Sequence, residues 1–228
     1  MNGEYQRLMI FCDFDGTISQ NDVLNKIFSK FGGPEVQKLE EKFKSGELDD
    51  RETLTRKWKR VKLDYQKFRD FIIREVKLDP YFKDFLELVS EKNIDFSILS
   101  GGFLNYIELL LAHNNITRGI PIYGNRLQFD GERVTPVFLH DIDSCHQSFG
   151  VCGSCKWKII KDQAPEQKKV IYIGDGLTDR CPAEEVDELL VKRGKLLEEY
   201  CQKQGLNYHS FGDFSDIIKY VFKDKDKI

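Results

Sequence analysis

Two aspartates near the N-terminus have the residue type and spacing for chemistry. Asp13 and Asp15 follow the apolar run 8–12 and are followed by Gly16 and Thr17. The apolar run predicts a short buried strand, whose end would hold the two carboxylates close together. Such carboxylates repel each other unless a cation or a shared proton compensates their charge. The spacing therefore indicates an active site.

Two later apolar runs, 94–99 and 169–173, also end in polar residues. Ser100 and Gly101 follow the first run, and Asp175 comes two residues after the second. In doubly wound sheets the ligand binds outside the carboxyl ends of the strands. If the three strands are neighbours, their ends meet. The Ser100 hydroxyl and the backbone N–H groups of the glycines after it, at a helix N-terminus, would then bind an anion.

The carboxylates at these strand ends suggest a divalent cation. Asp13, Asp15 and Asp175, with Asp179 nearby, would form an all-oxygen site. Such a site suits a hard cation, and Mg²⁺ is the usual one when a phosphate oxygen completes the octahedron.

The surrounding elements predict the fold. The periodicity is helical for about sixty residues after Thr17, and from Pro80 strands and helices alternate. We therefore predict an α/β, Rossmann-like doubly wound and mostly parallel sheet with an inserted helical cap domain. The expected core comprises residues 1–18 and 78–228, and the expected cap residues 19–77. Short strands are also expected at 120–123, 126–129, 134–138 and 188–191.

Composition limits the partners. The 228 residues include 35 basic and 38 acidic ones, for a net charge of −3, so the chain lacks the basic surface typical of nucleic-acid binding. No stretch has the apolar length of a membrane span, and residues 1–5 do not resemble a secretory signal. We expect a cytoplasmic protein with a small partner. The oligomeric state does not follow from these residues.

The cysteines allow a non-enzymatic interpretation. Cys145, Cys152 and Cys155 lie close to His140 and His146, and thiolate and imidazole are the preferred ligands of Zn²⁺. A structural zinc site, or a redox or metal-sensing protein, is therefore an alternative. One Cys-x-x-Cys pair with a third cysteine is a weak zinc signature, and reduced thiols are the simpler interpretation.

The polar signatures occur in the order of a known family. Asp13-Phe14-Asp15-Gly16-Thr17, then Ser100, then a lysine, then Gly174-Asp175-Gly176-Leu177-Thr178-Asp179 resemble the four motifs of the haloacid dehalogenase superfamily. The resemblance is to its phosphatase branch with a helical cap after the first motif. It implies a Mg²⁺-dependent phosphatase that acts on a small phosphorylated metabolite.

The resemblance also implies roles for single residues. Asp13 would be the nucleophile that forms an aspartyl-phosphate, and Asp15 the acid and base. Ser100, Gly101 and Lys156 would bind the phosphoryl group. Lys156 is chosen over the other lysines of its predicted helix because family members place this lysine at the helix start.

The metal would be held by Asp13, the backbone carbonyl of Asp15 and Asp175. Thr17 and Asp179 would orient these ligands from outside. Asp22 is expected to contact the leaving group, at the place where phosphoserine phosphatases typically carry a glutamate.

Within the superfamily the chain resembles the methionine-salvage phosphatases. They remove the 1-phosphate from 2-hydroxy-3-keto-5-methylthiopentenyl-1-phosphate. The features that carry this resemblance are residues 18–22, the cysteine-rich stretch into Lys156, and residues 205–208. Phosphoserine, phosphocholine or phosphoethanolamine, and pyridoxal-phosphate phosphatases of the same branch are alternatives, as is a phosphotransferase or phosphomutase.

Overall fold

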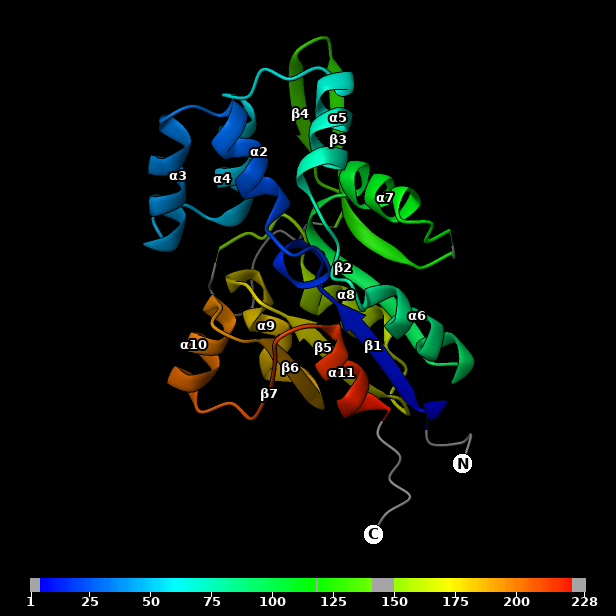
Figure 1. Cartoon of the computed structure of the whole chain (residues 1–228). Helices are drawn as coiled ribbons and strands as arrows, with labels where there is room; N and C mark the ends of the chain where they lie inside the picture. Colours follow the sequence, from blue (N-terminus) through cyan, green and yellow to red (C-terminus); the bar gives the residue numbers. More distant parts are fainter. Residues whose placement is uncertain (1–4, 118, 141–149, 223–228) are drawn as a thin grey trace.

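A seven-stranded sheet forms the centre of the molecule. The computed structural model describes residues 5–117, 119–140 and 150–222. The strand order is β4-β3-β2-β1-β5-β6-β7, and every neighbouring pair is parallel except β3 and β4 (Figure 1). The predicted α/β fold is therefore confirmed. The strands are β1 (Leu8–Cys12), β2 (Asp95–Phe103), β3 (Ile122–Asp130), β4 (Arg133–Val137), β5 (Lys169–Gly174), β6 (Glu188–Lys192) and β7 (His209–Phe211).

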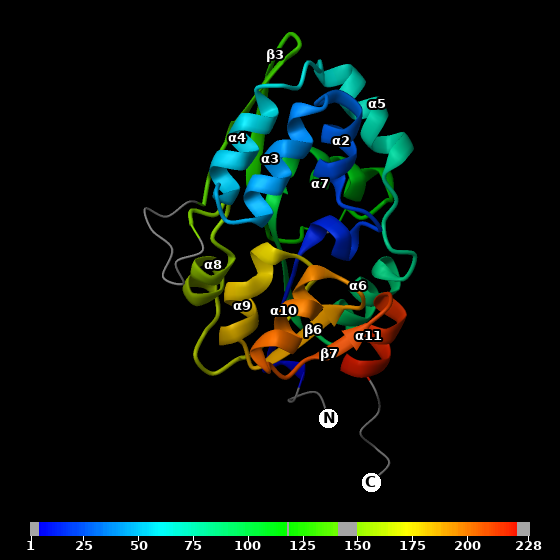
Figure 2. The ribbon, with the colours of Figure 1, turned by 90° about the vertical axis from the view of Figure 1, so that its left-hand side faces the viewer.

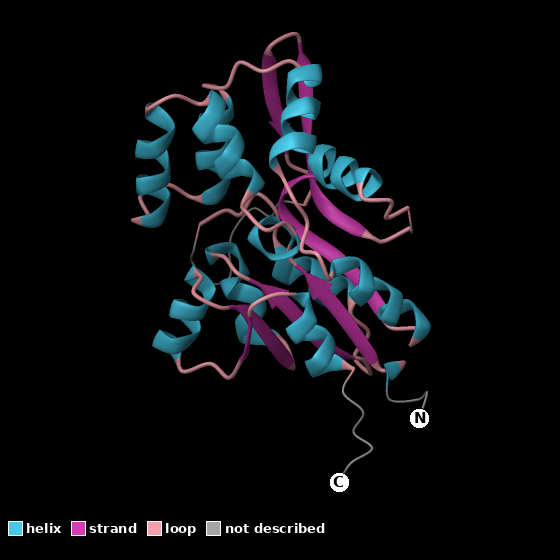
Figure 3. Cartoon of the chain, viewed as in Figure 1, coloured by secondary structure: helices cyan, strands magenta, loops and turns pink. Residues whose placement is uncertain are grey.

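Helices cover both faces of the sheet, because side chains of the central strand alternate between two apolar layers (Figure 3). Ile10 and Cys12 pack with one set of helices, and Met9 and Phe11 with the other. The first set is α6 (Phe82–Glu91), α7 (Leu104–His113) and α11 (Phe214–Val221). The second is α8 (Lys156–Gln163), α9 (Arg180–Glu185) and α10 (Leu196–Gln204). This is the doubly wound arrangement.

Four helices follow the first strand and lie above the sheet in Figure 2. They are α2 (Val23–Phe31), α3 (Glu35–Lys44), α4 (Asp50–Trp58) and α5 (Tyr65–Glu75). Asp22, Asp49 and Asp64 begin three of them, each by accepting a backbone N–H of the first turn with its carboxylate. In the part of the chain that the structure describes, no helix is long and apolar enough to cross a membrane.

The hairpin β3–β4 extends to the inserted helices. Phe129 on β3 packs against Tyr65 and Phe68 of α5, with ring centroids 5.4 and 5.2 Å apart. At the hairpin tip, the Leu63 N–H donates to the Glu132 carbonyl at 2.9 Å. One apolar cluster thus joins inserted helices and sheet. The division of the chain at 19–77 stays a prediction.

The strands differ from the sequence-based expectation in two places. The predicted strands 120–123 and 126–129 are one strand, β3, which pairs with β2 at its start and with β4 further on. The strand β7 was not predicted, because three residues are too few for a periodic pattern.

Candidate active site

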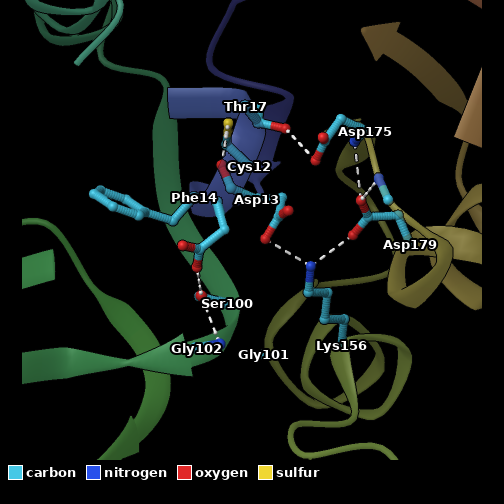
Figure 4. Close-up of polar contacts among 12 residues, drawn as sticks. Cys12, Asp13, Phe14, Thr17, Ser100, Gly101, Gly102, Lys156, Asp175 and Asp179 are labelled. Carbon is cyan, nitrogen blue, oxygen red and sulfur yellow. Dashed lines mark hydrogen bonds and ion pairs between the residues drawn. The ribbon is translucent and has the colours of Figure 1, made fainter. Parts of the chain in front are cut away.

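The three polar strand ends meet at one edge of the sheet. β1 lies between β2 and β5, with Cys12 opposite Ile98 on one side and Ile173 on the other. The Asp13 N–H continues this ladder by donating to the Ile173 carbonyl at 2.8 Å. The expectation that the three strands are neighbours is confirmed. Figure 4 shows the side chains that this topology brings together.

Lys156 lies between two carboxylates. Its Nζ is 2.7 Å from Asp13 Oδ1 and 2.6 Å from Asp179 Oδ1, and all three side chains are buried (Figure 4). Burial raises the pKa of Asp13 well above its usual range, while the charge of Lys156 opposes that shift. Burial alone would lower the pKa of Lys156, but the charges of Asp13 and Asp179 outweigh it and raise that pKa. The lysine therefore stays cationic beside Asp13.

The other two lysines of α8 lie elsewhere. Lys158 forms an exposed ion pair with Asp162, one turn further along the helix. Lys161 lies over the ring of Trp157, 4.7 Å from its centroid. Only Lys156 among the three pairs with the predicted site carboxylates in the described contacts.

The carboxylate of Asp179 accepts four hydrogen bonds from groups of the protein. Oδ1 accepts from Lys156 and from the Tyr172 hydroxyl. Oδ2 accepts the backbone N–H groups of Asp175 and Gly176, at 3.0 and 2.9 Å. These four bonds occupy the lone-pair sites of a carboxylate. Asp179 thus contacts Lys156 and the backbone of residues 175–176, and its role in orienting the metal ligands stays a prediction.

The carboxylate of Asp15 contacts residues of α7, β2 and α2. Oδ2 accepts from the hydroxyls of Tyr106, at 2.5 Å, and Ser100, at 3.2 Å, and Oδ1 accepts the Val23 N–H at 3.1 Å. Burial raises the pKa of Asp15 to about 7, and the charge of Asp22 adds to the shift. A carboxyl with this pKa can both give and take a proton near neutral pH.

The glycine pair after Ser100 leaves space for these contacts. A Cβ on Gly102 would lie 1.6 Å from the Tyr106 hydroxyl and 2.7 Å from Asp15 Oδ2. The Ser100 hydroxyl, which is buried, also accepts the Gly102 N–H at 2.9 Å. Gly101 lines the cavity described below. The phosphate-binding roles of Ser100 and Gly101 stay predictions.

The donor set fits a magnesium ion. Carboxylate oxygens of Asp13, Asp175 and Asp179 lie within 4.8 Å of one another. Burial raises the pKa of Asp175 to about 7, and the neighbouring charge of Asp179 adds to it, so a cation would relieve this repulsion. Because the oxygens of Asp179 already accept four hydrogen bonds, the carboxylates available to the metal are those of Asp13 and Asp175. The backbone carbonyl of Asp15 is the predicted third ligand.

Gly16 and Thr17 support Asp175. Gly16 has φ +80°, and a Cβ there would lie 2.3 Å from Asp175 Oδ2. The Thr17 hydroxyl donates to Asp175 Oδ1 at 3.2 Å (Figure 4). The glycine and the hydroxyl after the two aspartates thus set the position of this carboxylate.

A cavity of about 360 Å³ lies between these carboxylates and the inserted helices. Lys57 of α4 is buried on its wall, paired with Glu40 of α3 and 5.2 Å from the Phe28 ring centroid. Asp22 also lines the cavity, but its oxygens accept the backbone and side-chain N–H groups of Asn25 at 2.8 and 2.9 Å. The predicted contact of Asp22 with substrate therefore competes with its capping of α2. The apolar lining includes Leu24, Phe28, Phe43, Leu54, Leu177 and Leu196.

The described residues give no support for zinc. Cys145 and His146 lie outside the described residues, so the predicted set cannot be assembled. Among the residues that the structure describes, the three aspartates above form the one group of three or more suitable side chains.

Three side chains of the site were not indicated by the sequence. They are Tyr106, Tyr172 and Lys57. Tyr106 and Tyr172 fit the apolar periodicity of a helix and a strand, so they resemble ordinary core residues. Lys57 belongs to the basic run 56–60, and a run of this kind is typical of a solvated helix face. A buried lysine inside that run has no separate sequence signal.

Comparison with known proteins identifies a phosphatase family. Residues 8–209 match the sequence model of the family described as "Putative Phosphatase". A 2-hydroxy-3-keto-5-methylthiopentenyl-1-phosphate phosphatase of Brevibacillus brevis is 32% identical over 215 residues, which cover 94% of this chain and 95% of the relative.

Two solved structures share the fold. A HAD-family hydrolase from Salmonella enterica subsp. enterica serovar Typhi has a TM-score of 0.73 at 16% identity, over 96% of this chain and 72% of that one. A substrate-bound phosphoserine phosphatase has a TM-score of 0.70 at 18% identity, over 94% and 98%. The sequence match over residues 8–209 and the similarity to the Brevibacillus relative show that the chain belongs to this phosphatase family.

Proposed function

We propose that this phosphatase depends on Mg²⁺, works through an aspartyl-phosphate, and hydrolyses 2-hydroxy-3-keto-5-methylthiopentenyl-1-phosphate. The observation that carries the mechanism is the arrangement around Asp13. Its carboxylate is 2.7 Å from the ammonium of Lys156, and Asp15, two residues on, has a pKa of about 7. The proposed nucleophile and proton donor thus both line the cavity, and the cation contacts the nucleophile.

In the first step a carboxylate oxygen of Asp13 attacks phosphorus, and the bond from phosphorus to the leaving oxygen breaks. Asp15 gives its proton to that oxygen. Lys156 donates hydrogen bonds to the phosphoryl oxygens as charge develops on them. Mg²⁺, when bound, supplies charge stabilisation for the same oxygens.

In the second step Asp15 takes a proton from a water molecule, and the oxygen of that water attacks phosphorus. The bond between phosphorus and Asp13 breaks, which releases inorganic phosphate and restores both aspartates. Tyr106 and Ser100 hold Asp15 in place through both steps, since each donates a hydrogen bond to Oδ2.

The cavity supports the substrate assignment by its mixed lining. The leaving group of the proposed substrate has a hydroxyl and a keto oxygen near the phosphate and an apolar methylthio end. Lys57 offers N–H donors for such oxygens, while Phe28, Leu54 and their apolar neighbours suit a methylthio group. The named relative acts on this compound.

The test is a phosphate-release assay on a panel of phosphomonoesters. The purified chain is treated with EDTA and assayed with and without added Mg²⁺ on the salvage intermediate, phosphoserine, phosphocholine, phosphoethanolamine and pyridoxal phosphate. We expect release only with Mg²⁺, and the highest kcat/KM for the salvage intermediate. A higher value for phosphoserine would replace the substrate assignment. Transfer of the phosphoryl group to a sugar instead of water would indicate a phosphotransferase.

A further inference from the structure

Helix α4 begins against residues 150–153, the segment that precedes the active-site lysine. Asp50 Oδ2 accepts the Gly153 N–H at 2.8 Å, across 103 positions of sequence. The next residue, Arg51, donates its N–H to the Val151 carbonyl at 3.1 Å. Two hydrogen bonds therefore tie the start of an inserted helix to a loop of the core.

Glycines permit this close approach. Gly150 has φ +84°, and a Cβ there would lie 2.6 Å from the Cβ of Asp49. A Cβ on Gly153 would lie 3.1 Å from both Asp50 Oδ2 and Leu54 Cδ1. Contacts this short are tighter than ordinary van der Waals packing, so larger residues at either place would push the loop away from α4.

The same loop leads directly into the active site. The Cys155 N–H donates to the His140 carbonyl at 2.9 Å, which fixes the loop at its far end. The next residue, Lys156, begins α8 with its side chain buried and its Nζ 2.7 Å from Asp13. The position of Lys156 therefore depends on the loop, and the loop is attached to α4 by Asp50.

We propose that Asp50 is a positioning residue, which holds the 150–155 loop against α4 and thereby keeps Lys156 beside Asp13. The proposal rests on the function proposed above, because that function assigns Lys156 to the transferred phosphoryl group. Asp50 acts through Lys156 and links the inserted helices to the catalytic residues. The mechanism itself does not use its carboxylate.

Asp50→Ala and Asp50→Asn test this link. Alanine removes the acceptor of the Gly153 N–H, whereas asparagine keeps a carbonyl oxygen at the same place. For Asp50→Ala we expect amide hydrogen exchange in 150–155 to accelerate by about tenfold, and kcat on p-nitrophenyl phosphate to fall by about tenfold with KM within about twofold. Asp50→Asn should restore both quantities to within about twofold of the wild type.

Asp49→Ala is the matched control. Asp49 caps α4 by accepting the Glu52 N–H at 2.7 Å, so its loss weakens the helix start without removing the bond to Gly153. We expect a lower Tm, with exchange in 150–155 and kcat unchanged. A fall in kcat equal to that of Asp50→Ala would mean that the helix start, and not Asp50, sets the activity.

Unchanged exchange in 150–155 in Asp50→Ala would overturn the proposal, as would an equal loss of kcat in Asp50→Asn. If Asp50→Ala does not fold, Gly153→Ala replaces it, and the same rise in exchange and fall in kcat are expected. A wild-type chain that releases no phosphate would refute the proposed function alone, since the exchange measurement still tests the loop contact.

Discussion

Asp13 combines two demands on one carboxylate, because it must stay ionised although it is buried. The charge of Lys156 opposes the rise in the pKa of Asp13 that burial causes. Asp179 pairs with Lys156 in turn, and the Tyr172 hydroxyl donates to Asp179. A buried charge without such partners is costly, so a cluster of this kind is maintained where the charge is used. The same contacts allow substitution at Asp13 without loss of the fold, since Lys156 keeps Asp179 as its partner.

Asp13→Asn should therefore fold but lose activity. An amide is not a nucleophile toward phosphorus, and we expect kcat on p-nitrophenyl phosphate to fall by on the order of 10³-fold or more, with Tm little changed. Asp95→Asn is the control. Asp95 is exposed and is the first residue of β2, at the end of that strand that lies away from the site. Retained hydrolysis in Asp13→Asn would exclude the covalent mechanism.

Tyr106→Phe should change the pH dependence of activity. The Tyr106 hydroxyl donates to ionised Asp15 and so lowers the pKa of Asp15, which burial holds at about 7. Removing the hydroxyl raises that pKa further. Because the first step needs protonated Asp15, kcat/KM declines as pH rises through this pKa, and the decline should move to higher pH in the variant. A decline at the wild-type pH would remove Asp15 from the role of acid.

Among the elements, α2 connects the first motif to the cavity. It begins at Asp22, whose carboxylate accepts the Asn25 N–H, and the first helical residue, Val23, donates its N–H to Asp15. The start of α2 thus holds the proposed acid. Asp22 also lies close enough for its charge to raise the pKa of Asp15.

Asp22→Asn separates the role of Asp22 as the N-cap of α2 from the effect of its negative charge on the pKa of Asp15. Asparagine is as good an N-cap as aspartate, so Tm should be kept, whereas Asp22→Ala should cost about 1 kcal/mol of stability. Loss of the negative charge lowers the pKa of Asp15, so the alkaline decline of kcat/KM should move to lower pH, opposite to Tyr106→Phe. If Asp22 also contacts the leaving group, selectivity across the substrate panel changes as well. Equal selectivity in wild type and Asp22→Asn would limit Asp22 to the helix start.

The elements also show how far the sequence predicts the site. The buried strands β1, β2 and β5 were predictable, since apolar runs with polar ends are local patterns. The expected end of the second strand was wrong, because Ser100 and Gly101 lie within β2, which runs to Phe103. The choice of Lys156 as the site lysine required the family resemblance, because no local sequence pattern distinguishes Lys156 from Lys158. The contacts of Asp50 with Gly153 and of Lys57 with Glu40 join distant segments. Periodicity in a single sequence says nothing about such pairs.

On the scale of the molecule, the apolar core does not stop at the edge of the sheet. Trp58 of α4 lies between Phe28 of α2 and Phe103 at the end of β2, with ring centroids 5.0 and 5.6 Å away. It is fully buried, and the cluster around it continues into the layer of α6 and α11. Shared burial of this kind favours cooperative unfolding. The predicted cap and core should therefore unfold together.

The two tryptophans allow a direct measurement, because Trp58 lies in an inserted helix and Trp157 in α8 of the core. In Trp157→Phe the tryptophan fluorescence comes from Trp58 alone, and in Trp58→Phe it comes from Trp157 alone. We expect each variant to show a urea midpoint by fluorescence that coincides with its own far-UV circular dichroism midpoint. Trp58→Ala should lower the free energy of unfolding by about 3–5 kcal/mol in that single transition. A Trp58 signal lost at lower urea than the dichroism of the same variant would instead make the inserted helices a separately unfolding domain, with the boundary that the sequence predicts.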